Sequence, residues 1–175
     1  MRTLTDQLAN YAAYHRDRRN IATHFVGVPM ILFAVTVLLS RPSVAVGALT
    51  LTPAWIVAGF AALFYLRLSL GWGFVMSAVL AVSVGAAGTV AAQPTAVWLA
   101  SGIGLFLVGW VIQFVGHWYE GRKPAFVDDI VGLLVGPLFV VAEFAFLLGF
   151  GEELKRDIEA RGGPTRGGRT RASAA

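Results

Sequence analysis

The chain has 175 residues, of which 57% are apolar and 14% are charged, whereas soluble domains have roughly 45–50% apolar and about 25% charged residues. This excess excludes an ordinary small soluble domain, whose core must still be covered by polar groups. The net charge of +4 comes from basic ends around an apolar middle, which favours lipid head groups over nucleic acid as partners. Because the chain has no cysteine, disulfides, thiolate metal sites and cysteine nucleophiles are excluded.

Four apolar runs follow one another, and each is long enough to cross a hydrocarbon core of roughly 30 Å, which takes about 20 helical residues. They cover residues 23–40, 46–66, 70–92 and 96–116. The breaks between them are short, so neighbouring spans are expected to be antiparallel. Glycines in the third and fourth runs predict close helix packing, at Gly85, Gly88, Gly102, Gly104 and Gly109.

A fifth apolar run, residues 130–150, differs from the others because Pro137 and Glu143 lie inside it. Proline removes a backbone donor and kinks a helix, and an ionisable side chain at mid-bilayer costs at least ~2.5–3.5 kcal/mol without a partner. We therefore expect a broken, interfacial or re-entrant segment. The predicted fold is an all-α, polytopic membrane bundle of four spanning helices plus this fifth segment.

Basic residues beside the spans predict the orientation of the chain. They precede the first span and follow the fourth, at Arg16, Arg18, Arg19, Arg122 and Lys123. Both places are therefore expected on the cytosolic side of an integral membrane protein, in the inner membrane of a bacterium or the endoplasmic reticulum of a eukaryote. Residues 1–150 are expected to form one membrane-embedded domain, and residues 151–175 a basic, disordered tail.

The three histidines all lie beside the membrane, on the side where this topology places the basic residues. His15 precedes the first span, His24 opens it and His117 closes the fourth. His15 and His24 are nine residues apart, so on one unbroken helix they would point in opposite directions. Both can face one ion only if the chain turns between them, and Asp17 and Asn20 are candidate N-caps of a new helix.

A second group of polar residues surrounds His117. In a helix, Gln113, His117 and Glu120 fall at positions i, i+4 and i+7 and share one face. A carboxylate and an imidazole three residues apart can reach one ion, as in the Glu-x-x-His pairs of bundle metalloproteins. The alternative is a polar cap where the span meets water, with Trp118 and Tyr119 as interface anchors.

Imidazole and carboxylate ligands without thiolate suit iron, zinc, manganese or nickel, and open positions beside two or three histidines are typical of non-haem Fe(II) oxygenases. Three histidines are too few for a histidine-rich di-iron centre, so a mononuclear site is predicted. The polar residues around the histidines are candidates to bind a substrate, namely Tyr14, Arg16, Arg19, Asn20 and Gln113. The arginines also suit lipid head groups, and Glu143 is a candidate partner of a histidine or an arginine.

Two segments carry a resemblance to a known family. The first reads Tyr14-His15-x-x-x-x-Asn20-x-x-x-His24-x-x-Gly27-Val28-Pro29, and the second reads Trp110-x-x-Gln113-Phe114-x-Gly116-His117-x-x-Glu120-x-x-x-Pro124-Ala125. Together with Pro137 and Glu143 they resemble the fungal 2-hydroxy fatty acid dioxygenases, from about residue 8 to about residue 150. Many members have Asn-Pro where this chain has Asp17-Arg18-Arg19, which puts head-group recognition in doubt.

The resemblance implies an Fe(II)-dependent α-oxidation, in which a 2-hydroxy fatty acid and the co-substrate O2 give the fatty acid one carbon shorter. It implies that His15, His24 and His117 hold one Fe(II), and Glu120 is a further candidate catalytic residue on its geometry alone. Two alternatives remain. One is a non-catalytic lipid-binding or assembly protein whose histidines cap the helices, and the other is a zinc-dependent membrane hydrolase.

Overall fold

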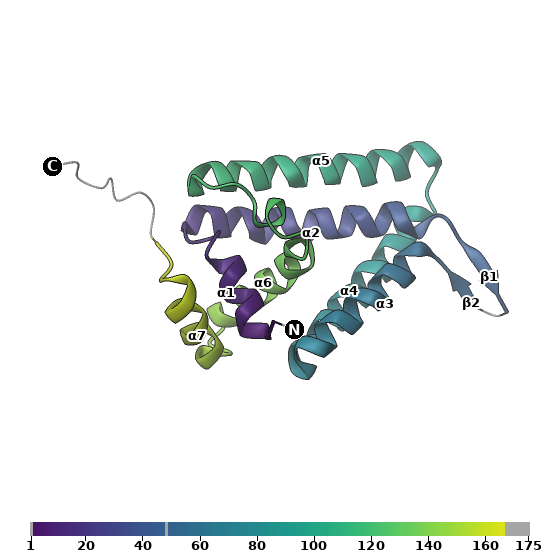
Figure 1. Cartoon of the computed structure of the whole chain (residues 1–175). Coiled ribbons are helices and arrows are strands. Elements are labelled where there is room, and N and C mark those ends of the chain that lie inside the picture. Colours follow the sequence, from purple (N-terminus) through teal and green to yellow (C-terminus); the bar gives the residue numbers. More distant parts are fainter. Residues whose placement is uncertain (1, 48, 167–175) are drawn as a thin grey trace. The chain divides into compact units, whose positions relative to one another are not determined.

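The computed structural model describes residues 2–47 and 49–166, and this part of the chain is mostly helical (Figure 1). Its α-helices are α1 (Leu4–Ala12), α2 (Arg18–Ser40), α3 (Pro53–Leu68), α4 (Leu70–Ala91), α5 (Thr95–Glu120), α6 (Gly132–Leu147) and α7 (Glu152–Gly162). It also contains an antiparallel hairpin of β1 (Val44–Val46) and β2 (Leu49–Leu51), and the 3-10 helix η1 (Ala125–Val127). The predicted helical class is confirmed, with this short hairpin as the exception.

Three of the described helices are long and apolar enough to cross a membrane. They are α2, α4 and α5, with 23, 22 and 26 residues. α3 and α6 have 16 residues each, which gives a rise of only about 24 Å at about 1.5 Å per residue. A hydrocarbon core is roughly 30 Å thick, so helix length supports three spans, and the total of four stays a prediction.

The second apolar run, residues 46–66, becomes helical later than predicted. Its first part belongs to the β1–β2 hairpin, in which Val44 pairs with Leu51, and β-branched residues favour such strands. α3 begins only at Pro53, because the Thr52 side chain accepts a backbone N–H of the first turn and proline suits the first helical position. Cap and proline together set the start of this helix.

The chain divides into two compact units. One comprises Met1–Val26 and Val111–Ala175, and the other comprises Gly27–Trp110. α2 and α5 pass from one unit into the other, so each unit contains one end of both helices. The single membrane-embedded domain over residues 1–150 stays a prediction.

Within the Gly27–Trp110 unit, α3 and α4 form a helical hairpin with a very short connection. Gly73 of α4 lies so close to α3 that a Cβ at this position would come within 2.5 Å of the Leu66 Cα atom. The Trp98 indole of α5 donates to the Val37 carbonyl of α2 at 2.8 Å. The contact between α3 and α4 agrees with the expectation that a short loop makes neighbouring helices antiparallel.

Within the Gly27–Trp110 unit, the later part of α2 packs against the first part of α5, with glycines of α5 at the contact. A Cβ at Gly102 would overlap Leu38, and a Cβ at Gly109 would lie 2.7 Å from Ile31 Cγ1. The predicted close packing is therefore confirmed at these two glycines. It is wrong for three others, which have no neighbouring atom within 4 Å outside their own helix in the described structure: Gly85, Gly88 and Gly104.

In the other unit, α1 packs against α6 and α7. Apolar side chains of these helices form the buried core, namely Leu8, Ala12, Val135, Leu138, Phe139, Ala142 and Ile158. The predicted disordered tail over residues 151–175 is therefore wrong in its first part. α7 forms because two acidic residues occupy its first turn and because Ile158 is buried. Residues 167–175 lie outside the described residues.

α6 is continuous from Gly132 to Leu147, so the segment is not broken at Pro137 as predicted. Pro137 lies in the second turn, where a proline removes one backbone hydrogen bond and the rest of the ladder continues. The preceding Gly136 leaves room for another helix, since a Cβ there would lie 3.0 Å from the Tyr11 hydroxyl. An interfacial or re-entrant placement of this segment stays a prediction.

Candidate metal centre

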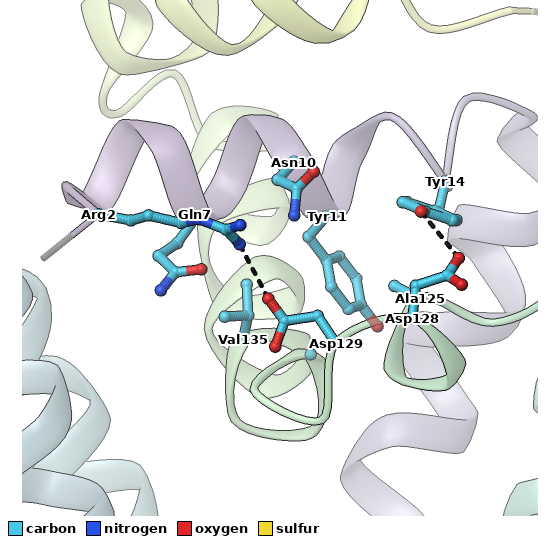
Figure 2. A pocket seen from close by; sticks show the side chains of 10 residues that line it. Arg2, Gln7, Asn10, Tyr11, Tyr14, Ala125, Asp128, Asp129 and Val135 are labelled. Carbon is cyan, nitrogen blue, oxygen red and sulfur yellow. Dashed lines mark hydrogen bonds and ion pairs between the residues drawn. The ribbon is translucent and has the colours of Figure 1, made fainter.

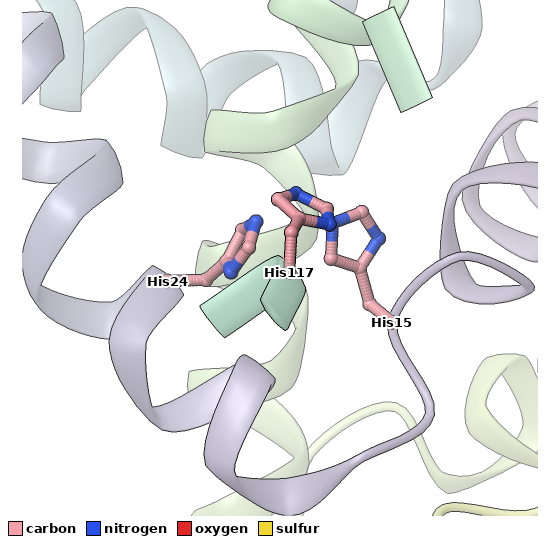
Figure 3. Close-up of side chains that lie close together, drawn as sticks. All are labelled: His15, His24 and His117. Atoms are coloured by element: carbon pink, nitrogen blue, oxygen red, sulfur yellow. The ribbon is translucent and has the colours of Figure 1, made fainter. Parts of the chain in front are cut away.

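Three histidines from distant parts of the sequence meet within the Met1–Val26 and Val111–Ala175 unit (Figure 3). They are buried, with 0%, 2% and 7% of the surface exposed for His15, His24 and His117. The ring centroid of His15 lies 4.3 Å from that of His24 and 5.0 Å from that of His117. One ring nitrogen of each lies within 4.8 Å of those of the other two. The three side chains thus form one candidate donor set.

A turn between α1 and α2 allows His15 and His24 to face each other, as the helix phase predicts. His15 lies in this turn, and α2 begins at Arg18, slightly earlier than the sequence indicates. Asp17 caps the helix, because its Oδ1 accepts a backbone N–H of the first turn at 2.8 Å. Asn20, the other candidate cap, lies within that first turn.

Hydrogen bonds to backbone carbonyls orient two of the rings. His15 Nδ1 donates to the Tyr11 carbonyl at 2.7 Å, and His24 Nδ1 donates to the Asn20 carbonyl at 2.9 Å. A neutral imidazole with its proton on Nδ1 keeps the lone pair of Nε2 free. Rings held in this way by a carbonyl are typical of histidines that bind metals.

Two buried ring nitrogen atoms of the histidines have no hydrogen-bond partner among the described residues and could act as metal ligands. In the part of the chain that the structure describes, His15 Nε2 and His117 Nδ1 are both buried and have no partner. Leaving a buried polar atom unsatisfied costs about 1–3 kcal/mol. Because neutral imidazoles are good ligands of iron and zinc, the residues present fit one metal ion.

Two aromatic side chains pack against the His15 ring. The Tyr11 ring stacks on it with centroids 4.2 Å apart and an angle of 9° between the planes, and the Phe139 centroid lies 5.6 Å away. Burial lowers the pKa of His15 well below its usual value, and repulsion by a charged His24 lowers this pKa further. His15 is therefore neutral and able to donate its lone pair.

Glu120 lies outside the group of histidines, although it follows His117 by one helical turn. Its side chain is fully buried. Its Oε2 accepts the backbone N–H groups of Arg16 and Asp17 at 2.9 and 2.7 Å and the Asn20 amide at 3.2 Å. The carboxylate therefore holds the turn between α1 and α2, and this geometry favours an orienting role over that of a ligand.

Asn20 and Gln113 are both buried, and their side-chain oxygens have no hydrogen-bond partner among the described residues. Asn20 donates from Nδ2 to the Tyr14 carbonyl at 3.4 Å, and its Oδ1 faces Gly116, where a Cβ would lie 2.6 Å away. Asn20 thus fills the contact between α2 and α5. Gln113, one turn before the metal centre on α5, keeps an acceptor for a ligand.

The two arginines predicted to bind substrate are engaged by the protein itself. Arg16 is only 5% exposed, and it donates from Nε to the Ala12 carbonyl at 2.6 Å and from Nη1 to the Gly163 carbonyl. Its guanidinium is therefore turned inward and is not placed as a lipid anchor. Arg19 pairs with Asp17 at 2.8 Å and has a side chain that is 42% exposed.

A polar pocket of 270 Å³ lies between α1 and the segment around η1 (Figure 2). Tyr14, another predicted substrate residue, lines it and donates from its hydroxyl to Asp128 Oδ2 at 3.0 Å. Arg2 and Asp129, which also line the pocket, form an ion pair at 2.8 Å. Tyr11 lines it as well, so the pocket and the metal centre share one aromatic side chain.

Sequence reasoning missed three residues that support the site, namely Tyr11, Phe139 and Arg166. A signal for Tyr11 was present, since it precedes His15 by four residues, a spacing that would place both side chains on one face of a helix. Phe139 and Arg166 come from distant segments and have no spacing that links them to a histidine.

The part of the chain that matches known proteins includes all three histidines. Residues 1–148 match the family described as "2-hydroxy-palmitic acid dioxygenase Mpo1-like". The chain is 34% identical over 158 residues to "2-hydroxy-palmitic acid dioxygenase MPO1" of Saccharomyces cerevisiae (strain ATCC 204508 / S288c), over 89% of this chain and 87% of the yeast protein. No solved structure matches the chain. All three histidines lie within the residues that match the family.

Proposed function

Because the chain belongs to the 2-hydroxy-palmitic acid dioxygenase Mpo1-like family, we propose that it is an Fe(II)-dependent dioxygenase that shortens 2-hydroxy fatty acids by one carbon. Its yeast relative is named for 2-hydroxy-palmitic acid, which supports this substrate class. In the overall reaction, O2 oxidises the 2-carbon to a new carboxyl group, the old carboxyl carbon leaves as CO2, and water is formed.

The observation that carries the proposal is the group of three buried histidines with unpartnered ring nitrogens. His15, His24 and His117 would hold the metal ion. When bound, Fe(II) supplies open coordination positions that O2 and the substrate's carboxylate and hydroxyl can occupy. The three-imidazole set lacks thiolate and needs no second metal, which agrees with a mononuclear site.

The protein's own residues orient the site and exclude water from it. The Tyr11 and Asn20 carbonyls fix two imidazoles in the tautomer that presents Nε2. Tyr11 and Phe139 cover His15, so its surface is 0% exposed. The Gln113 side-chain oxygen is a buried acceptor without a partner among the described residues. We propose that it accepts a hydrogen bond from the hydroxyl group of the substrate.

The acyl tail of a fatty acid could lie in the membrane beside α5. α5 exposes apolar side chains just before the metal centre, with Val111 61% and Phe114 54% exposed. Such side chains suit an acyl tail or lipid, while the polar head reaches the histidines at the end of the helix. By the distribution of lysine and arginine, the histidines lie on the cytosolic side.

A zinc-dependent hydrolase is a second candidate, because three histidines also form catalytic zinc sites. The two functions differ in their need for oxygen. The test measures O2 uptake and fatty acid products of the purified chain with Fe(II) and 2-hydroxypalmitate, against palmitate, which lacks the 2-hydroxyl group.

We expect O2 uptake and pentadecanoate only with the hydroxy acid, and neither with a His117→Ala variant. Turnover without O2, or with zinc alone, would support the hydrolase. Absence of turnover in iron-loaded protein would support a non-catalytic lipid-binding role and would contradict the proposal.

A further inference from the structure

A short segment at the end of the described chain packs onto the turn between α1 and α2. We name this segment, residues 163–166, the C-terminal strap. It follows α7 and lies beyond residues 1–148, which match the family. The reaction proposed above assigns no role to it.

The strap pairs with the turn through backbone hydrogen bonds. The Arg166 N–H donates to the Arg16 carbonyl at 2.7 Å, and the Arg18 N–H donates to the Arg166 carbonyl at 3.1 Å. These bonds form an isolated parallel bridge between Asp17 and Arg166. The turn that contains His15 is therefore hydrogen-bonded to the strap through its backbone.

The Arg166 side chain reaches the carboxylate that holds the same turn from the inside. Its Nη2 donates to Glu120 Oε1 at 3.1 Å, while the other carboxylate oxygen accepts the Arg16 and Asp17 N–H groups. The Glu120 side chain is 0% exposed, and a buried charge that loses its partner is strongly destabilising. Arg166 thus stabilises the group on which the turn depends.

α7 attaches the strap to α1. Ile158 of α7 is only 2% exposed, and Arg161 forms an ion pair with Asp6 of α1 at 2.5 Å. At the start of the strap, the Gly163 carbonyl accepts a hydrogen bond from the Arg16 guanidinium. The strap is therefore bound at both of its ends to the turn between α1 and α2, which contains His15.

We infer that the C-terminal strap is a positioning element of the metal centre and that Arg166 is its main positioning residue. Arg166 holds the turn from the outside and Glu120 holds it from the inside, and between them His15 is directed at the other two histidines. The inference rests on the proposed function for what His15 binds. Its structural half, the order of the turn, needs no metal.

The test uses three variants of the full chain. Arg166→Ala removes the guanidinium, Arg166→Lys keeps a cation that can reach Glu120, and Arg156→Ala removes the same charge from an exposed position of α7. Amide hydrogen exchange of Arg16 and Asp17 is measured in each. Exchange is expected to be about tenfold faster in Arg166→Ala than in wild type, since one charge-assisted bond is lost.

Arg166→Lys and Arg156→Ala are expected to exchange at close to the wild-type rate. The dissociation constant for Fe(II), measured by anaerobic titration, should rise about tenfold in Arg166→Ala, the scale known for groups that orient metal ligands. Arg166→Lys should restore most of this affinity, and the KM for 2-hydroxypalmitate should not change.

Equal exchange rates in Arg166→Ala and Arg156→Ala would overturn the inference. An Fe(II) dissociation constant of Arg166→Ala equal to that of wild type would overturn it as well. If the wild-type chain binds no metal, the proposed function fails. The exchange comparison then decides about the strap without it.

Discussion

In two of the three histidines, a hydrogen bond to a backbone carbonyl fixes the tautomer of the ring. The bonds from His15 and His24 to carbonyls four residues earlier leave Nε2 for a ligand. Both carbonyls belong to helical segments whose positions are set by packing. The fold itself therefore orients both rings.

Glu120 is the residue whose role the structure changes most. The sequence offers it as a ligand or orienting group, because it shares a helix face with His117. In the structure its carboxylate is used by the Arg16 and Asp17 N–H groups. A helical spacing shows which residues share a face, but it does not show which partner a side chain chooses.

Two substitutions of Glu120 separate an orienting group from a ligand. Glu120→Ala leaves two buried N–H groups without an acceptor, at a cost of about 1–3 kcal/mol each, and should lower both thermal stability and iron content. Glu120→Gln keeps one oxygen for these N–H groups and should retain most of the iron. Loss of iron in Glu120→Gln as complete as in Glu120→Ala would show that the carboxylate is itself a ligand.

At the scale of helices, the contact between α2 and α5 sets the position of two of the histidines. A Cβ at Gly116 would overlap Thr23 Oγ1 and would lie 2.6 Å from Asn20 Oδ1. Both partners belong to the turn of α2 that precedes His24. The glycine before His117 is therefore required by the close approach of the two helices.

Gly116→Ala is expected to push α2 and α5 apart and to cost about 1–3 kcal/mol, the usual scale of overpacking. Gly104→Ala on the same helix is the matched control, since a Cβ there meets no atom within 4 Å. It should leave stability unchanged or raise it by up to about 1 kcal/mol. Thermal unfolding and iron content in detergent check both, and equal values for the two variants would refute this view of the helix contact.

The sequence predicts helices well where an apolar run is long, as in α2, α4 and α5. It fails where local signals compete, since Thr52 and Pro53 delay the start of α3 after a short hairpin. The break at Pro137 is also wrong, because one proline early in a well-packed helix is tolerated. The helix around Ile158 depends on burial against α1, which polar composition does not reveal.

The sequence predicts that the three histidines can come together, but it does not predict the residues that support them. Helix phase shows that the chain must turn between His15 and His24, which the structure confirms. The pairing of Arg166 with Glu120 joins residues 46 positions apart. No local periodicity relates such residues, so only the folded chain brings them together.

For the whole molecule, one contact between α2 and α5 limits the topology. Within the Gly27–Trp110 unit, the contact of Leu38 with Gly102 puts the end of α2 beside the start of α5. The chain between these points must therefore return to the side from which it left. If α4 crosses the membrane, as its length allows, α3 would have to cross as well, so the total of four crossings stays a prediction.

Cysteine labelling tests this topology, because the chain has no cysteine of its own. Ser43→Cys and Gln93→Cys are expected to react with an impermeant maleimide from the non-cytosolic side. Lys123→Cys is expected to react only from the cytosolic side. Labelling of Ser43→Cys and Gln93→Cys from opposite sides would show that α3 does not cross the membrane.

His15, His24 and His117 are proposed to hold one iron together. The most direct measurement is the iron content per chain of anaerobically loaded protein in mild detergent, for wild type and His117→Ala, with Gly104→Ala as the control for handling. We expect about one iron per chain in wild type and in Gly104→Ala, and almost none in His117→Ala, because such a site has three protein ligands. A His117→Ala protein with the full iron content would show that these histidines do not hold the iron together.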